Sequence, residues 1–263
     1  MKLKQAILLL SIFIALIALP PIGYKFHAYY SPAKERTVYH VRSHNDDTLR
    51  IAYIGDSWAD FHRNHKCLIA DIVEEHIQRP VKVETFGIGG LTSKEIYHAL
   101  FEIEQFKKFM ECGFDYCFIS AGINDTNKKM SVAYYKESMN CIIRFMLANQ
   151  IHPIILEIPD YDIHKSYRQQ KTEKILIRKM SMLINDIPLD CKQIYRNALD
   201  ELIREKGYEG EVSIVRYKDW NTNYEEDLNN LYTGDGMHLN KDGYERLDSC
   251  IARSIIKKVQ LPI

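Results

Sequence analysis

The 263-residue chain lacks an excess of either charge, because 35 lysine and arginine residues balance 35 aspartate and glutamate residues. Proteins that bind nucleic acid or an acidic polymer through their overall charge carry a basic excess. The composition therefore gives no reason to expect nucleic acid as a partner. Internal repeats and low-complexity tracts are also missing. One domain of ordinary size, with appendages, is the expected organisation.

Several cofactor and metal motifs are missing as well. The six cysteines form no C-x-x-C pair, which favours buried free thiols, although a disulfide stays open for a domain outside the cytoplasm. His62, His65 and Cys67 lack a fourth ligand at a sensible spacing, so no metal is expected. The glycine-rich turn at 87–90 lacks the G-K-[ST] ending and the G-x-G-x-x-G spacing of phosphate-binding loops. We expect no cofactor.

The N-terminus carries the one long apolar run. Lys2 and Lys4 precede Ala6–Ile22, and an aromatic cluster follows it, formed by Tyr24, Phe26, Tyr29 and Tyr30. We predict a membrane anchor over residues 1–23, with the rest of the chain outside the cytoplasm. A signal peptide that is cleaved to release a secreted protein is the alternative. It is disfavoured because Leu16 stands where a small residue is wanted. A buried core helix is a third interpretation.

Beyond the anchor, residues 24–47 are polar and aromatic and are interpreted as a tether, and residues 48–263 as the main domain. Strands and helices alternate through this domain. The predicted strands are Leu49–Ile54, Val81–Phe86, Tyr116–Ser120, His152–Ile158 and Val212–Tyr217. Such alternation predicts a central, mostly parallel five-stranded sheet with helices on both faces. Ligands of these sheets bind at the carboxyl ends of the strands.

The segment 160–210 is longer than a simple connection. It predicts two helices, around 165–184 and 190–207, and the first is rich in cations: Lys165, Arg168, Lys171, Lys174, Arg178 and Lys179. A solvated helix face is the plainer interpretation. A lid, or a contact with anionic glycan or lipid headgroups, is the other.

Four short segments carry the chemistry. They are Gly55-Asp56-Ser57, Gly87-Ile88-Gly89-Gly90, Gly122-Ile123-Asn124-Asp125 and Asp235-Gly236-Met237-His238. The first three follow predicted strands, so their side chains and backbone donors are expected at one edge of the sheet. Together they provide a nucleophile, oxyanion donors and a histidine with a nearby carboxylate, which is what ester cleavage requires.

Each candidate residue also has an ordinary structural interpretation. Ser57 follows a strand and begins a predicted helix, where it would otherwise be an N-cap serine. Gly90 would be a tight-turn glycine, and Asn124 an Asx-turn residue. His238 would be a surface-loop histidine, but Asp235 three residues earlier can fix its tautomer while the other nitrogen faces the serine.

Taken together and in this order, the segments resemble those of the SGNH hydrolases, also called GDSL-type esterases and lipases. The resemblance runs from about Leu49 to the C-terminus. It implies a flavodoxin-like three-layer α/β/α sandwich and acyl-group hydrolysis or transfer without metal or organic cofactor. It places the nucleophile on Ser57, the oxyanion donors on Ser57, Gly90 and Asn124, and the catalytic pair on Asp235 and His238. The chain departs from the family at Trp58 and Thr85, which leaves the substrate open.

The sequence thus predicts a serine esterase that removes small acyl groups from a small molecule or from envelope or extracellular carbohydrate. A glycan O-acetyltransferase with the same residues is the first alternative. A non-catalytic carbohydrate-binding protein is the second, although binding alone does not require such a set of reactive residues. Acyl chain length and oligomeric state are not predicted.

Overall fold

The computed structural model describes residues 3–168, 170–221 and 223–260. It divides the chain into two compact units, Met1–Pro32 and Ala33–Ile263. Helix α1 (Leu3–Tyr30) forms the first unit and contains Pro20 and Pro21. Within the described residues, no helix combines the length and apolar content that a bilayer crossing requires. The predicted membrane-spanning anchor over residues 1–23 is therefore not supported.

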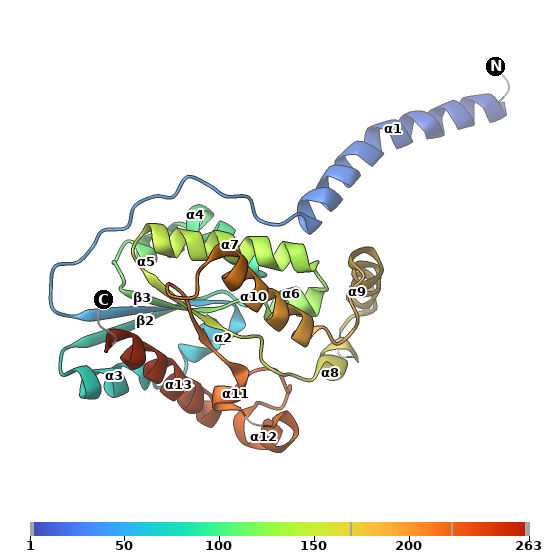
Figure 1. The fold of residues 1–263 in the computed structure, drawn as a ribbon. Coiled ribbons are helices and arrows are strands. Elements are labelled where there is room, and N and C mark those ends of the chain that lie inside the picture. The colour runs from blue at the N-terminus through green and yellow to red at the C-terminus, as the bar shows by residue number, and fades with distance from the viewer. Residues whose placement is uncertain (1–2, 169, 222, 261–263) are drawn as a thin grey trace. The chain divides into compact units, whose positions relative to one another are not determined.

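A parallel sheet forms the centre of the second unit (Figure 1). Its strand order is β2-β1-β3-β4-β5, and every neighbouring pair is parallel. The strands are β1 (Leu49–Gly55), β2 (Val81–Gly87), β3 (Tyr116–Ser120), β4 (His152–Leu156) and β5 (Ser213–Val215). This order confirms the predicted flavodoxin-like fold. From β1 the chain adds β2 on one side of the sheet and then β3, β4 and β5 on the other. Ligands of such sheets bind at this change of side, between β1 and β3.

Helices cover both faces of the sheet, which makes three layers (Figure 1). The helices of one face are α4 (Ser93–Glu102), α5 (Glu104–Met110), α7 (Val132–Ala148) and α10 (Lys192–Lys206). Those of the other are α2 (Ser57–His62), α3 (Ile69–Ile77), α11 (Tyr217–Trp220) and α13 (Lys241–Val259). Strand β1 supplies both cores by alternation: Ile51 and Tyr53 enter one, and Ala52 and Ile54 enter the other.

The remaining described helices lie in the connections. They are α6 (Ile123–Lys128), α8 (Ile163–Arg168), α9 (Thr172–Asn185) and α12 (Tyr224–Leu231). The first of the two helices predicted within 160–210 is thus divided into α8 and α9. The second corresponds to α10.

The segment that enters the second unit differs from the predicted tether. The backbone N–H of Ala33 donates to Ser138 Oγ at 3.1 Å, and the Tyr39 hydroxyl donates to the carbonyl of Leu100 at 2.8 Å. Tyr39 and Val41 also pack against the hydrophobic core. The compact unit therefore begins at residue 33, before the predicted domain start at residue 48.

Close packing at the end of β1 explains its glycine. A Cβ at Gly55 would lie 2.1 Å from Ser120 Oγ and 2.2 Å from the Ser120 carbonyl oxygen. Such distances are far inside van der Waals contact, so only glycine lets β1 and β3 approach here. This approach brings the residues after β1 close to those after β3.

Candidate active site

Ser57 is the first residue of α2, directly beyond the carboxyl end of β1. The helix begins here because the Asp56 carboxylate accepts the backbone N–H of Trp58 at 3.0 Å, which is an N-cap bond. Asp56 is fully buried. Trp58 is also fully buried, with its ring 5.9 Å from that of Trp220. Trp58, where the chain departs from the family pattern, is therefore a residue of the hydrophobic core.

His238 reaches Ser57 from the loop between α12 and α13. Its Nε2 lies 2.8 Å from Ser57 Oγ, and its Nδ1 lies 2.6 Å from Asp235 Oδ2. Ser57 and His238 are 181 positions apart in the chain. The fold thus brings together the serine, histidine and aspartate that the sequence singled out.

The Asp235 carboxylate fixes the histidine tautomer. Burial raises its pKa, but hydrogen bonds from His238, Met237 and Thr233 outweigh burial and lower the pKa to about 2. An ionised carboxylate only accepts hydrogen bonds, so Nδ1 of His238 carries the proton and donates it. The lone pair of Nε2 then faces the Ser57 hydroxyl. This is the arrangement in which a histidine can take a proton from serine.

The other two predicted oxyanion donors, Gly90 and Asn124, lie beside Ser57, one in a turn and the other in the first turn of a helix. Gly90 is exposed and has φ +83°, a left-handed conformation that favours glycine. A Cβ at the neighbouring Gly89 would lie 3.9 Å from Ser57 Cβ, which places this loop next to the nucleophile. Asn124 lies on α6 and donates both amide hydrogens within the protein, to Asp56 Oδ2 at 3.1 Å and to the Leu91 carbonyl at 3.0 Å.

A second buried carboxylate, which no sequence pattern marked, supports the segments that carry Gly90 and Asn124. Asp125 accepts the backbone N–H of Ser93 at 2.8 Å and the Ser93 hydroxyl at 2.5 Å. It thereby joins the start of α4 to α6, next to Asn124. Burial raises the pKa of Asp125 to about 6. Burial, together with the charge of Asp125, raises the pKa of Asp56 to about 7, against hydrogen bonds from Trp58 and Asn124.

An aromatic side chain borders the histidine, and the sequence analysis did not find it. The Phe61 ring centroid lies 4.6 Å from that of His238, and Phe61 is 39% exposed. Phe61 is on α2, one helical turn after Ser57, so helical spacing from the predicted nucleophile is the signal that could have identified it.

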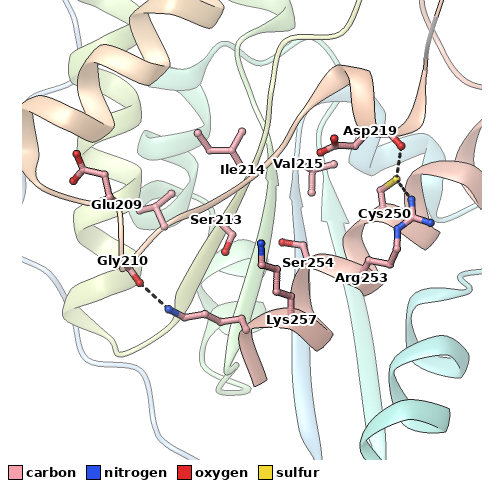
Figure 2. Close-up of a pocket in the computed structure, with 12 residues that line it drawn as sticks. Glu209, Gly210, Ser213, Ile214, Val215, Asp219, Cys250, Arg253, Ser254 and Lys257 are labelled. Atoms are coloured by element: carbon pink, nitrogen blue, oxygen red, sulfur yellow. Dashed lines mark hydrogen bonds between the residues drawn. The ribbon is translucent and has the colours of Figure 1, made fainter. Parts of the chain in front are cut away.

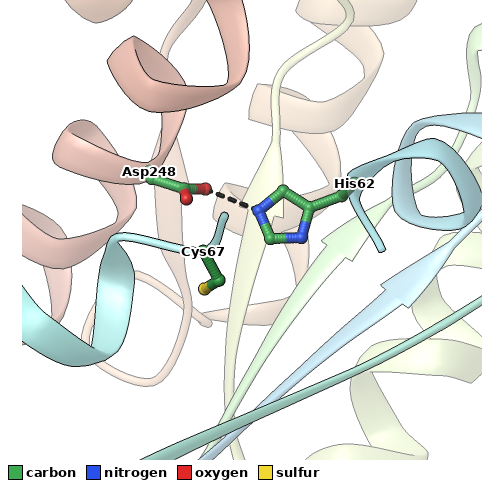
Figure 3. A group of neighbouring side chains, drawn as sticks. All are labelled: His62, Cys67 and Asp248. Atoms are coloured by element: carbon green, nitrogen blue, oxygen red, sulfur yellow. Dashed lines mark hydrogen bonds and ion pairs between the residues drawn. The ribbon is translucent and has the colours of Figure 1, made fainter. Parts of the chain in front are cut away.

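His62 and Cys67, which were set aside as metal ligands, meet Asp248 rather than His65 (Figure 3). His62 Nε2 lies 2.8 Å from Asp248 Oδ1, and the other carboxylate oxygen accepts the Leu68 N–H at 2.8 Å. The His62 and Asp248 side chains are 1% and 0% exposed. Both carboxylate oxygens are already hydrogen-bonded, so this cluster is a buried polar link between α2 and α13.

Two of the cavities among the described residues lie outside the serine–histidine contact. One, of about 580 Å³, follows the edge strand β5 and α13 and is lined by Ser213, Cys250, Arg253 and Lys257, among others (Figure 2). None of its lining residues belongs to the four segments. The other, of about 280 Å³, borders the loop that carries His238, with Asp162, Asn229, Thr233 and Gly236 in its wall.

Comparison with known proteins agrees with this geometry. The GDSL-like lipase/acylhydrolase family matches residues 53–246. No curated protein matches the chain. A lipase/acylhydrolase from Enterococcus faecalis is similar in structure, with a TM-score of 0.53 and 18% identity over 80% of this chain and 96% of that one.

Two further solved structures have the same fold. A GDSL-like lipase from Bacteroides thetaiotaomicron has a TM-score of 0.50 and 17% identity, over 80% of this chain and 88% of its own. An acetylxylan esterase from Geobacillus stearothermophilus has a TM-score of 0.50 and 16% identity, over 81% and 95%. Because the family match spans most of the second unit, the chain belongs to the GDSL-like lipase/acylhydrolase family and is an ester-hydrolysing enzyme.

Proposed function

We propose that the protein is a serine esterase that removes small acyl groups from carbohydrate through an acyl-enzyme. The observation that carries the mechanism is the unbroken chain of contacts from Ser57 Oγ to His238 (2.8 Å) and from His238 to Asp235 (2.6 Å). Few structural roles require a half-exposed serine, a histidine and an ionised carboxylate in this order.

In the proposed first step, His238 Nε2 takes the Ser57 proton as Oγ attacks the ester carbonyl carbon. The carbonyl oxygen becomes an oxyanion that the N–H groups of Ser57 and Gly90 and the amide of Asn124 would stabilise. His238 then returns the proton to the departing alcohol, and the acyl group stays on Ser57. Water repeats these steps and releases the acid. Asp235 remains ionised throughout and stabilises the imidazolium.

Two observations support a carbohydrate ester. The cavity of about 280 Å³ beside the catalytic loop offers polar groups for hydroxyl-bearing ligands: Asp162, Asn229 and Thr233. Gly90 is exposed and Ser57 only half-buried, so the site is open enough for an ester attached to a larger molecule. One protein of the same fold is described as an acetylxylan esterase.

The test is Ser57→Ala, assayed with p-nitrophenyl acetate and with acetylated oligosaccharides. We expect kcat/KM to fall at least about 10⁴-fold with unchanged folding, because the nucleophile is lost. A serine-directed phosphonate should label the wild type and not this variant. Ser249→Ala is the matched control, since that hydroxyl donates to the Glu245 carbonyl within α13. Retained turnover in Ser57→Ala would refute the mechanism, and acyl transfer to a sugar in place of water would identify a transferase.

A further inference from the structure

Phe61 is an exposed aromatic side chain next to the proposed catalytic histidine. Its ring centroid lies 4.6 Å from that of His238, and the residue is 39% exposed. Every other described phenylalanine of the second compact unit is buried or half-buried. Phe61 belongs to neither hydrophobic core. An aromatic side chain outside the core and beside a reactive pair of residues is a candidate contact for a ligand.

Two neighbours on α2 lie on opposite sides of Ser57. With about 100° between successive helix residues, Phe61 is rotated by about 40° from Ser57 in one direction and Asp60 by about 60° in the other. Asp60 adjoins the glycine-rich turn that carries an oxyanion donor, because a Cβ at Gly89 would lie 3.8 Å from Asp60 Oδ2. Phe61 adjoins His238. The nucleophile therefore has an oxyanion side and a separate histidine side.

The alcohol part of the ester belongs on the histidine side. In the proposed mechanism, His238 Nε2 donates a proton to the oxygen of the departing alcohol, so that oxygen lies within about 2.6–3.2 Å of Nε2. Nε2 is an atom of the ring on which Phe61 packs, so the carbon bonded to that oxygen comes within reach of the Phe61 ring. The oxyanion and the acyl chain extend from the same tetrahedral carbon in other directions. Phe61 therefore borders the alcohol part of the ester.

We propose that Phe61 is a specificity-determining residue that stacks on the C–H face of a sugar ring in the alcohol part of the ester. The inference rests on the proposed function, because it takes carbohydrate as that alcohol. The face of an aromatic ring carries partial negative charge, which attracts the weakly positive C–H groups on the face of a pyranose. The sugar hydroxyls lie around the edge of the pyranose and remain available to polar groups and water.

The test compares acetate esters of three alcohols: ethyl acetate, cyclohexyl acetate and an acetylated oligosaccharide. Ethanol has no ring, and cyclohexanol has a ring face like that of a sugar. The comparison uses kcat/KM, which covers the steps up to release of the alcohol. For Phe61→Leu, we expect the kcat/KM of both ring alcohols relative to ethyl acetate to fall about fivefold, because an apolar side chain remains but the aromatic face is lost. Phe61→Tyr should restore both ratios.

Phe26→Leu is the matched control, since Phe26 is a 43% exposed phenylalanine of the first compact unit. It should leave both ratios at their wild-type values. The p-nitrophenyl esters of acetate, propionate and butyrate hold the alcohol constant, and Phe61→Leu should lower kcat/KM for all three by the same factor. Urea unfolding checks the folding of each variant. Phe61→Met repeats the comparison should Phe61→Leu fail to fold.

Three results would overturn the proposal. An equal loss for all three alcohols, or no loss, would show that Phe61 only packs against His238, and would leave the proposed function standing. A loss that changes with acyl chain length would assign Phe61 to the acyl side. Cleavage of ethyl acetate but not of the oligosaccharide by the wild type would refute the carbohydrate substrate and the sugar contact together, and this result requires no variant.

Discussion

Changing Asp235 to asparagine tests whether this carboxylate fixes the tautomer of the proposed catalytic histidine. The amide oxygen of Asp235→Asn can still accept the backbone N–H groups of Met237 and His238, which now donate to Oδ1 at 2.8 and 3.0 Å. The amide nitrogen replaces Oδ2, the acceptor of His238 Nδ1. A donor there favours the tautomer with the proton on Nε2, which cannot take the proton of Ser57.

The loss of activity should greatly exceed the loss of stability. With the wrong tautomer, we expect kcat/KM to fall about 10⁴-fold at neutral pH. The carboxylate is 43% exposed, so water screens its charge, and the unfolding free energy should fall by only about 1 kcal/mol. The assay is p-nitrophenyl acetate hydrolysis beside urea unfolding of the same samples.

Thr233→Val is the matched control. It removes a 2.8 Å hydrogen bond to the same carboxylate without placing a donor opposite Nδ1. We expect less than about a tenfold change in kcat/KM, because the remaining bonds hold the carboxylate in place. If Asp235→Asn lost no more activity than Thr233→Val, the tautomer argument would be wrong.

Two further predictions concern stability. The pKa of Asp56 is raised to about 7 and that of Asp125 to about 6, from 3.8, so between about pH 4 and 7 the folded protein holds protons that the unfolded chain releases. Burial also lowers the pKa of His152 from 6.5 to about 4, which acts in the opposite sense, but this shift is smaller than those of the two aspartates together. Urea unfolding should therefore show stability falling as pH rises through this window, and a rise would contradict the burial argument. Asp248→Ala leaves the His62 ring and the Leu68 N–H without their buried partner. We expect a loss of about 3–5 kcal/mol by urea unfolding, while zinc or chelator should leave the wild-type melting temperature unchanged.

Most of the sheet could be predicted from the sequence because each strand is a short apolar run followed by glycine, proline or polar residues. The predicted strand Tyr116–Ser120 has the bounds of β3, and the strand before Ser57 ends one residue later than predicted, at Gly55. His238 follows no strand, and its place beside Ser57 was predicted from the spacing to Asp235 and from the family resemblance. Placing the segments after β1, β2 and β3 together required only that the loops at the carboxyl ends of a parallel sheet meet. That rule is independent of side-chain detail.

What the sequence did not reveal depends on contacts between distant positions. The bond from His62 to Asp248 spans 186 positions, and no local pattern marks it. The segment after Pro32 has no strand or helix period, so the packing of Tyr39 and Val41 on the core left no signal. Polar tethers and packed extended segments look alike until the surface that they cover is known.

The two internal hydrogen bonds of Asn124 have a consequence for selectivity. At rest the amide is already engaged by Asp56 Oδ2 and by the Leu91 carbonyl. In the proposed mechanism, a neutral ester oxygen is too weak an acceptor to displace a peptide carbonyl, whereas a tetrahedral intermediate bears a full negative charge and can do so. The Asn124 amide would then bind the substrate only as the tetrahedral intermediate forms. It would lower the activation free energy without tightening the binding of the unreacted ester.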